Sequence, residues 1–245
     1  MLPGLYSAAT AMAAATTNHE VIAHNLAHLN VPGFRRGITS FATFETALQA
    51  AQPGAATNTP KLGTRIEAVK PDFTPGRLEM TGRTLDVALQ GEGFFVLEGP
   101  HGPLYTRNGV FFLDRNGKLV NTEGLPVRGQ GGPISVPSDA AVEQIHIAGD
   151  GTVRVANREI GRLELVRFAD NRQLVPAGTT TFEAPPGAAM RPFEGTVAQG
   201  ARESSNVLAV DELIRLMGGL RYFEAAQRAL RSISEAVQQN TSPRG

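Results

Sequence analysis

The chain of 245 residues carries 23 basic and 23 acidic side chains, and this zero balance gives no overall field to draw nucleic acid or an acidic membrane surface, while it permits self-association. Cysteine is absent, which excludes disulfides, thiolate metal sites and cysteine nucleophiles. No stretch reaches the roughly 18 apolar residues of a membrane span and no basic start precedes an apolar run near Met1, so we expect no membrane insertion and no cleaved Sec-type signal peptide.

The first predicted element is a helix that begins near Leu5 and ends by Pro32-Gly33, where a helix breaker precedes a flexible exit. Its first half is dense in alanine, which favours helix and lets a neighbouring segment approach closely. Apolar positions recur more weakly along it than in the last helix of the chain. They are Leu5, Ala9, Met12, Ala23 and Leu26.

The middle of the chain, residues 70–200, is predicted to form short strands joined by tight turns. Asn116-Gly117 and Asp150-Gly151 lie between apolar runs, and such pairs signal hairpins because primed turns need positive φ. Ahead of this region, residues 38–50 fit either a short helix or an extended arm, and residues 51–64 fit a loop or linker. Residues 176–200 fit a second loop-rich stretch. The expected strands are Leu85–Leu89, Phe94–Leu97, Val110–Leu113, Leu119–Val120, Ile134–Val136, Gln144–Ile147, Val153–Val155 and Leu163–Phe168.

A long amphipathic helix is predicted over residues 207–239. Its apolar residues follow alternating steps of three and four, a spacing typical of a seam that packs on another helix. A helix of about 33 residues would span about 50 Å, longer than the β-rich part needs, so we expect both ends to serve assembly. Gly218-Gly219 interrupts it at a cost of about 2 kcal/mol relative to Ala-Ala, and marks either a tolerated weakness or kink, or a site where another backbone comes very close. The seam residues are Leu213, Leu216, Leu220, Phe223, Leu230 and Val237.

Four stretches occur in a fixed order: AHNLAHLNVPGFRR at Ala23–Arg36, TGRTLDVALQGEGFFVL at Thr81–Leu97, YTRNGVFFLDRNGKLVNTEGLPV at Tyr105–Val127 and ESSNVLAVDELIRLM at Glu203–Met217. In this order they resemble the signature segments of the bacterial flagellar axial proteins, the rod and hook family. In the first stretch Asn25, Leu26, Ala27, Asn30, Gly33, Phe34 and Arg35 match the family pattern. His24 and His28 replace asparagines there, and Ser204 and Leu208 depart from the pattern of the last stretch.

The resemblance implies terminal helices that pack with those of neighbouring subunits around an axis, and an outer β-rich domain. It implies export through the flagellar type III apparatus without signal cleavage. The implied partners are copies of the chain, other flagellar rod and hook proteins and the export apparatus, with no nucleic acid. Chain length favours a rod protein over a hook protein, and the short 41–75 segment favours the proximal over the distal rod.

We therefore predict a mixed α and β protein whose long N- and C-terminal α-helices pair in a coiled-coil-like bundle, with an inserted β-rich domain of hairpins. Its predicted parts are an axial helix and motif at 1–36, a linker or arm at 37–75, the β-rich domain at 76–200 and a second axial helix at 201–245. We expect unfolded or fluctuating ends in the free protein, and a helical tube that spans the periplasm in the flagellar basal body and transmits torque.

Particular residues follow from these predictions. Phe34 would anchor the exit of the first helix, and Gly33 would supply backbone freedom there. The residues assigned to the assembly interface are Leu5, Met12, Ile22, Asn25, Leu26, Asn30, Gly33, Phe34, Asn206, Val210, Leu213, Leu220 and Phe223. Those assigned to the β core are Leu85, Asp86, Val87, Gly91, Gly93, Phe94 and Phe95.

Candidate chemical sites are sparse. Glu20, His24 and His28 share one helix face and could ligate a metal, but a further strong ligand would be needed, and a polar or solvated face is favoured. Gly91-x-Gly93 precedes a strand rather than a helix, which favours a turn over a phosphate cradle. Asp114-x-Asn116-Gly117 lacks the later bidentate Glu of a calcium loop. No serine lies in a nucleophile elbow, so we expect no enzyme activity, metal or cofactor.

Three alternatives stay open. The first is another axial component, such as a distal rod or hook-type protein. The second is a non-flagellar secreted scaffold that assembles by itself without flagellar components. The third is an enzyme on the β-rich domain, which would need a polar pocket with shifted titrations.

Overall fold

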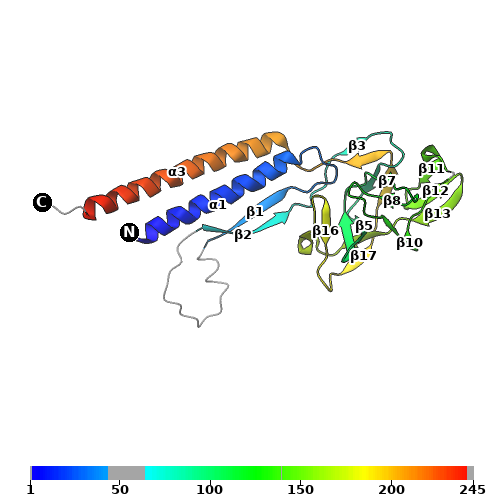
Figure 1. Cartoon of the computed structure of the whole chain (residues 1–245), viewed down its shortest axis with the longest axis horizontal. Helices are drawn as coiled ribbons and strands as arrows, with labels where there is room; N and C mark the ends of the chain where they lie inside the picture. The colour runs from blue at the N-terminus through cyan, green and yellow to red at the C-terminus, as the bar shows by residue number, and fades with distance from the viewer. Residues whose placement is uncertain (1, 44–63, 139, 242–245) are drawn as a thin grey trace. The chain divides into compact units, whose positions relative to one another are not determined.

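The computed structural model describes residues 2–43, 64–138 and 140–241. They separate into two compact units, which are coloured along the chain in Figure 1. The helical unit comprises the described parts of residues 1–27, 37–70 and 208–245, and the β-rich unit comprises those of 28–36 and 71–207.

The helical unit contains two long helices and a two-stranded sheet. Helix α1 (Leu2–Ala27) lies beside helix α3 (Ala209–Thr241), and strand β1 (Gly37–Thr43), which pairs with β2 (Thr64–Pro71), contacts α1 (Figure 1). The extended alternative for residues 38–50 therefore holds for the part up to Thr43, and residues 44–50 lie outside the described part. Asp211 and Glu212 lie in the first turn of α3, where negative charge complements the helix dipole.

The predicted coiled-coil-like bundle is wrong. Among the described residues only α1 and α3 are long helices, and two residues placed on the seam, Leu213 and Leu220, are 49% and 46% exposed. A coiled coil needs large apolar knobs from both helices. The buried positions of α1 include the small residues Ala8, Ala14 and Ala15, which supply no such knobs.

The β-rich unit supports the predicted β-rich domain of hairpins. Its largest sheet has six strands in the order β15-β16-β6-β5-β14-β17, and all neighbours in it are antiparallel. The unit also contains short strand pairs and a three-stranded sheet, β11-β12-β13. The strands are β3 (Leu78–Met80), β4 (Val87–Gln90), β5 (Phe94–Gly99), β6 (Gly102–Thr106), β7 (Phe112–Leu113), β8 (Leu119–Val120), β9 (Arg128–Gly129), β10 (Gly132–Pro133), β11 (Ile145–Ile147), β12 (Thr152–Val155), β13 (Arg158–Arg162), β14 (Leu165–Phe168), β15 (Val175–Pro176), β16 (Thr181–Glu183), β17 (Met190–Pro192), β18 (Thr196–Gln199) and β19 (Ala201–Glu203).

Strand β5 lies between two hydrophobic cores. Phe95 and Leu97 belong to the larger core, and Phe94 and Val96 belong to a smaller core with aromatic side chains such as Phe168. Successive side chains of a strand point to opposite faces. A continuous apolar run is therefore what a strand buried on both faces requires, and the predicted strand Phe94–Leu97 is such a run.

Both predicted hairpin turns are confirmed. Strands β7 and β8 pair across Asn116-Gly117, and β11 and β12 pair across Asp150-Gly151. The glycines of the two turns have φ of 76° and 85°, which is why glycine is required there. A third hairpin, β12–β13, turns through Ala156 and Asn157 at positive φ and was missed, because only its asparagine signals such a turn.

The prediction of a loop-rich stretch at residues 176–200 holds for most of its residues and is wrong where short strands form. This stretch contains β16, β17 and β18. Strand β17 is exposed at all three residues and lies at an edge of the six-stranded sheet. Edge strands of this kind need no apolar alternation, so periodicity could not reveal them.

Candidate functional site

Three charged side chains, Arg35, Glu203 and Arg107, meet inside the β-rich unit. Arg35 Nη2 lies 2.6 Å from Glu203 Oε1, and Arg107 Nε lies 2.8 Å from Glu203 Oε2. The three side chains are 1%, 1% and 5% exposed. We call them the Arg35–Glu203–Arg107 cluster. At this burial the ions stabilise the fold only where further hydrogen bonds satisfy them.

The neighbouring backbone supplies several of those hydrogen bonds. Gly76 N donates to Glu203 Oε1 at 2.8 Å, and Arg107 Nη1 donates to the carbonyl oxygens of Gly91 and Gly93, both at 2.8 Å. Burial lowers the pKa of the Arg107 guanidinium, and the carboxylate of Glu203 opposes this shift by favouring the charged form. The cluster thereby joins β19 to Arg107, which directly follows β6, and to the turn that precedes β5.

Gly33 and Phe34 lie next to this cluster along the chain. Gly33 N donates to Glu203 O at 2.8 Å. Gly33 has φ of 70°, and a Cβ there would lie 2.3 Å from Asn108 N, so only glycine fits. Phe34 is 2% exposed, and its ring stacks on that of His28 with 4.9 Å between centroids. Both residues thus make contacts within the chain, and their predicted role in assembly stays a prediction.

Asn206 ties three segments of the β-rich unit together. Its Oδ1 accepts from Arg36 N at 2.7 Å, and its Nδ2 donates to Asp72 O at 2.8 Å and Thr74 O at 3.1 Å. One amide side chain thereby satisfies backbone groups of segments far apart in sequence. The structure gives Asn206 this internal function, whereas the sequence assigned it to the subunit interface.

A second polar cluster lies in the helical unit. Asn25, which is 1% exposed, donates from Nδ2 to Gly37 O at 3.0 Å and accepts at Oδ1 from Gly37 N at 2.8 Å. Its Nδ2 also lies 3.4 Å from Oε2 of the buried Glu212. Asn25 therefore links α1, the start of β1 and the first turn of α3, and Ile22 is buried one turn earlier in α1.

Of the two adjacent glycines in α3, only Gly219 lies where a larger side chain would clash. A Cβ on Gly219 would lie 2.7 Å from His19 Nε2, while one on Gly218 would meet no heavy atom within 4 Å. The His19 ring also lies 6.3 Å from that of Phe223. The close neighbour at Gly219 is thus a side chain of α1 rather than another backbone.

Among the described side chains of α3, five large apolar ones other than the aromatic Tyr222 remain in solvent. Their exposed fractions range from 46% at Leu220 to 68% at Val210. Each of them lies three or four residues from another member of the set, which places them on one face of the helix. We call this set the exposed α3 stripe. It consists of Val210, Leu213, Ile214, Met217 and Leu220.

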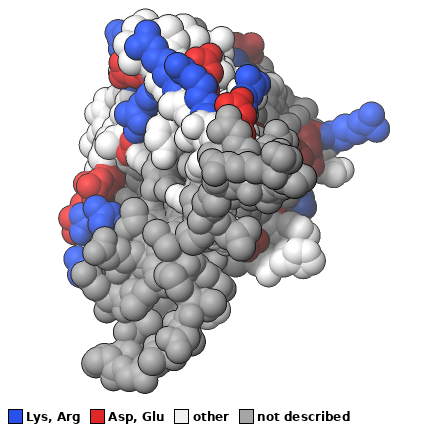
Figure 2. All heavy atoms as spheres, turned by 90° about the vertical axis from the view of Figure 1, so that its left-hand side faces the viewer, with Lys and Arg blue, Asp and Glu red and all other residues white. Residues whose placement is uncertain are grey.

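Charged side chains of both signs lie elsewhere on the surface. Figure 2 shows Lys and Arg side chains gathered with Asp and Glu side chains toward the top of the face in view. On α3 the basic residues Arg215, Arg221, Arg228 and Arg231 are exposed. Arg228 Nη2 lies 3.8 Å from Glu224 Oε2 one turn earlier, a distance at which an exposed pair contributes well under about 1 kcal/mol.

Little in the described residues points to metal or acid–base chemistry. No group of three or more His, Cys, Asp or Glu side chains among them could hold a metal ion. Asp114 and Asp150 have lowered pKa values because backbone N–H groups of their own turns donate to them, which is a structural role. No described helix is both long and apolar enough to cross a bilayer.

Comparison with known proteins fits this geometry. The family model for the flagellar hook protein FlgE/F/G D1 domain matches residues 88–155, and that for the flagellar basal body rod FlgEFG protein C-terminal region matches residues 198–241. The flagellar basal-body rod protein FlgG of Buchnera aphidicola subsp. Acyrthosiphon pisum is 31% identical, over 97% of this chain and 98% of the relative. The chain belongs to the flagellar basal-body rod protein family.

Rod-family relatives carry two names. The FlgG protein of Agrobacterium fabrum is 33% identical over 93% of this chain and 94% of its own length. The FlgF protein of Salmonella typhimurium is 32% identical over 94% of each. The two names match equally well, so the proximal position stays a prediction. The 41–75 segment on which it rests falls partly outside the described residues.

The structure brings together rod-family stretches that lie far apart in sequence. Arg35, Arg107 and Glu203 come from three of the four stretches and form one cluster, while Asn25 and Glu212 come from the first and last stretches and meet in the helical unit. The four charged residues among these five were missed as site residues. Each stretch holds several charged residues, so nothing local distinguished these four, and their partners lie far away in sequence.

The remaining predicted interface residues fall into two groups. Met12, Leu26 and Phe223 are half-buried, and Asn30 is exposed. Val210, Leu213 and Leu220 belong to the exposed α3 stripe. The backbone of Leu5 lies in α1, and its side chain is outside the described part.

Proposed function

We propose that this chain, a structural subunit of the flagellar basal-body rod, meets its neighbours in the rod through the exposed α3 stripe. The observation that carries this proposal is that the chain itself leaves five large apolar side chains, on one helix face, about half in solvent. Exposed contiguous apolar surface of this kind marks protein interaction sites. The partners we propose are other copies of the chain and other rod and hook proteins.

The energetics of the stripe favour an array over a pair. Full burial of a large apolar side chain contributes about 1.5–3 kcal/mol, and these five are already about half-buried. Covering them therefore contributes about 4–8 kcal/mol, against an association cost of roughly 4–15 kcal/mol. One such contact is therefore marginal. A subunit held by several neighbours loses its translational and rotational freedom only once, so all its contacts share that cost. Contacts that do not close on themselves produce an open helical tube, which could transmit torque.

The route and timing of assembly form a second part of the proposal. We propose export through the flagellar type III apparatus with the N-terminus kept intact, and incorporation at the proximal rod. The helices α1 and α3 contact one another within one chain, so pairing with each other needs no neighbour. That the ends are unfolded or fluctuating before incorporation stays a prediction, which hydrogen exchange on the free chain would test.

Substitutions on the stripe test its role. Met217→Ser and Leu213→Ser should each lower incorporation into basal bodies roughly four- to tenfold, because each removes about a fifth of the apolar surface of the proposed contact. The readouts are the amount of the chain in purified basal bodies and the motility of a strain that carries only the variant. Met190→Ser is a matched control, since Met190 is 58% exposed against 54% for Met217 but lies on β17.

The Met190→Ser control distinguishes a specific effect at the stripe from a general effect of replacing an exposed methionine. We expect normal incorporation of Met190→Ser and a loss for the stripe variants at unchanged thermal stability. Equal incorporation of all three variants would show that the stripe is not an assembly surface. Export is checked separately, by measuring each variant in the culture medium of an export-proficient strain. If the stripe variants are missing from that medium, their defect precedes assembly.

A further inference from the structure

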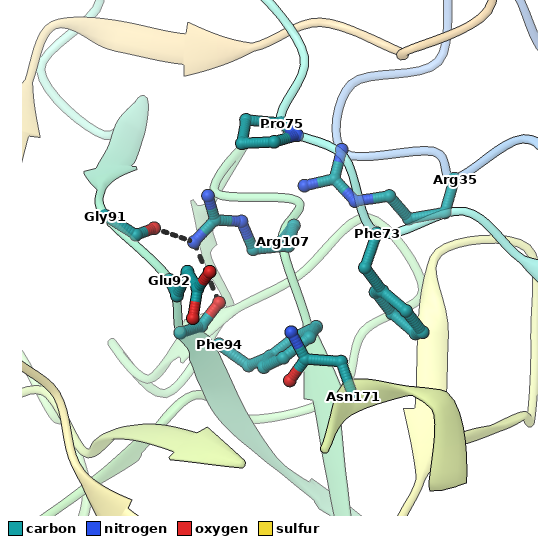
Figure 3. A pocket seen from close by; sticks show the side chains of 9 residues that line it. Arg35, Phe73, Pro75, Gly91, Glu92, Phe94, Arg107 and Asn171 are labelled. Atoms are coloured by element: carbon teal, nitrogen blue, oxygen red, sulfur yellow. Dashed lines mark hydrogen bonds between the residues drawn. The ribbon is translucent and has the colours of Figure 1, made fainter. Parts of the chain in front are cut away.

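A small cavity opens beside the Arg35–Glu203–Arg107 cluster, within the β-rich unit. Its volume is about 50 Å³, and its lining includes Arg35, Arg107, Glu92, Asn171, Phe73 and Phe94. Figure 3 shows the two guanidinium groups together at one end, with Glu92 beside Arg107 and with Phe94 and Asn171 at the other end. The guanidinium groups of the two arginines therefore lie at a cavity partly lined by phenylalanine rings. These rings exclude water, which strengthens electrostatic interactions there.

The buried charges at this cavity do not balance. Two buried guanidinium groups share the one buried carboxylate of Glu203, which already accepts hydrogen bonds from Arg35, Arg107 and Gly76 N. Glu92 is exposed and forms no ion pair with either arginine within the described residues. Among the buried groups, the two cations therefore share one anion, and the charge of the exposed Glu92 offsets the second cation only across the solvent-accessible edge of the cavity.

Hydrogen-bond donors are left over in the same place. Among the described residues, neither Nε nor Nη1 of Arg35 has a partner, although both atoms are buried and the side chain is 1% exposed. The buried Oδ1 of Asn171 also lacks a partner, but this atom is an acceptor and adds no donor to the site. Buried charged donors almost always find acceptors, so the orphaned atoms of Arg35 point to an acceptor that the chain does not itself supply.

The size of the cavity restricts the chemistry of that acceptor. A water molecule needs about 10–15 Å³ of such volume, so about 50 Å³ admits a group of three or four heavy atoms. A carboxylate has three, whereas a phosphate ester or a nucleotide is larger. Carboxylate oxygens also form the strong, charge-assisted hydrogen bonds that a guanidinium favours.

We propose that this cavity is a carboxylate-binding site, in which Arg35 donates to the bound carboxylate and Phe73 and Phe94 shield it from water. The carboxylate is either that of a small free acid or an acidic side chain of a second copy of this chain. The site does not depend on the α3 stripe and stands apart from the proposed mode of assembly.

Acetate is the probe for the site. The full chain is titrated with sodium acetate at constant ionic strength, against sodium chloride, while the Nε–H resonance of Arg35 is followed by ¹H–¹⁵N NMR. We expect a saturable shift of this resonance with acetate alone. No shift, or the same shift with chloride, would overturn the proposal and leave water or an adventitious ion as the acceptor.

Two variants near the cavity change the affinity in opposite directions. Asn171→Asp adds a negative charge at the lining and should weaken acetate binding at least tenfold, whereas Glu92→Gln removes one and should tighten it. Their matched controls are the exposed Asn157→Asp and Glu98→Gln, which should leave the affinity unchanged. Equal affinities in all four variants would contradict a carboxylate in this cavity.

The two sources of the carboxylate are distinguished by sedimentation. If the carboxylate belongs to a second copy, acetate competes with it and lowers the average mass of self-associated chain, compared with chloride. If it belongs to a free acid, the mass is the same in both salts while the Arg35 resonance still shifts. Either result supports the site, and only the first makes it part of a subunit contact.

Discussion

Replacing Glu203 with glutamine should destabilise the β-rich unit far more than the loss of an ordinary ion pair. The substitution keeps the shape but removes the one carboxylate between Arg35 and Arg107, whose side chains are 1% and 5% exposed. Breaking a buried pair by removing one partner costs about 3–5 kcal/mol, because the other charge is left buried. At about 2–4 °C per kcal/mol for a protein of this size, we expect a fall in Tm of roughly 6–20 °C.

Glu164→Gln is the matched control for this effect. Arg128 Nε lies 2.8 Å from Glu164 Oε2, the same distance as in the Arg107–Glu203 pair, but these side chains are 44% and 28% exposed. An exposed pair contributes about 0–1 kcal/mol, so the control should change the free energy of unfolding by less than that. Calorimetry and urea titrations followed by near-UV circular dichroism measure both variants. Losses within about 1 kcal/mol of each other would refute the reasoning from burial.

Two further predictions concern α3 and a turn. Gly218→Ala should raise the helix stability by about 1 kcal/mol and Gly219→Ala should not, because its Cβ would lie 2.7 Å from His19 Nε2; equal thermal melts by circular dichroism would contradict the observed packing. The backbone N–H of Lys118 lies 2.7 Å from Asp114 Oδ1 and lowers the pKa of Asp114 in the folded state. The ionised carboxylate therefore stabilises the fold above about pH 4. This contribution is lost as the pH falls through the folded-state pKa. The free energy of unfolding of Asp114→Asn should therefore fall less steeply at acid pH than that of the unsubstituted chain. An equal fall in both would show that the Asp114 carboxylate does not contribute to the pH dependence.

The sequence predicted those features that depend on local patterns. The run Phe94–Leu97 is a strand because all four residues are apolar and both faces are buried. The turn at Gly117 was visible because a positive φ demands glycine next to asparagine or aspartate. The family was visible because its motifs are themselves local stretches. Features with a short-range physical cause could therefore be predicted without coordinates.

Features that depend on long-range pairing could not be predicted. Glu203 lies 168 residues from Arg35 and 96 from Arg107, and no local signal joins them. The helical seam was misplaced for a related reason. Periodicity shows that Leu213 and Phe223 are apolar but not which of them meets α1, and only the contact of His19 with Phe223 decides this.

The absence of cysteine from the chain makes a single Met217→Cys variant a direct probe of the central claim, that neighbouring subunits cover the exposed α3 stripe. Labelling with a maleimide is measured on the free chain and on purified basal bodies, each before and after denaturation. The account predicts fast labelling of the free chain, protection in native basal bodies and full labelling of both after denaturation. Equally fast labelling of native basal bodies and free chain would contradict it.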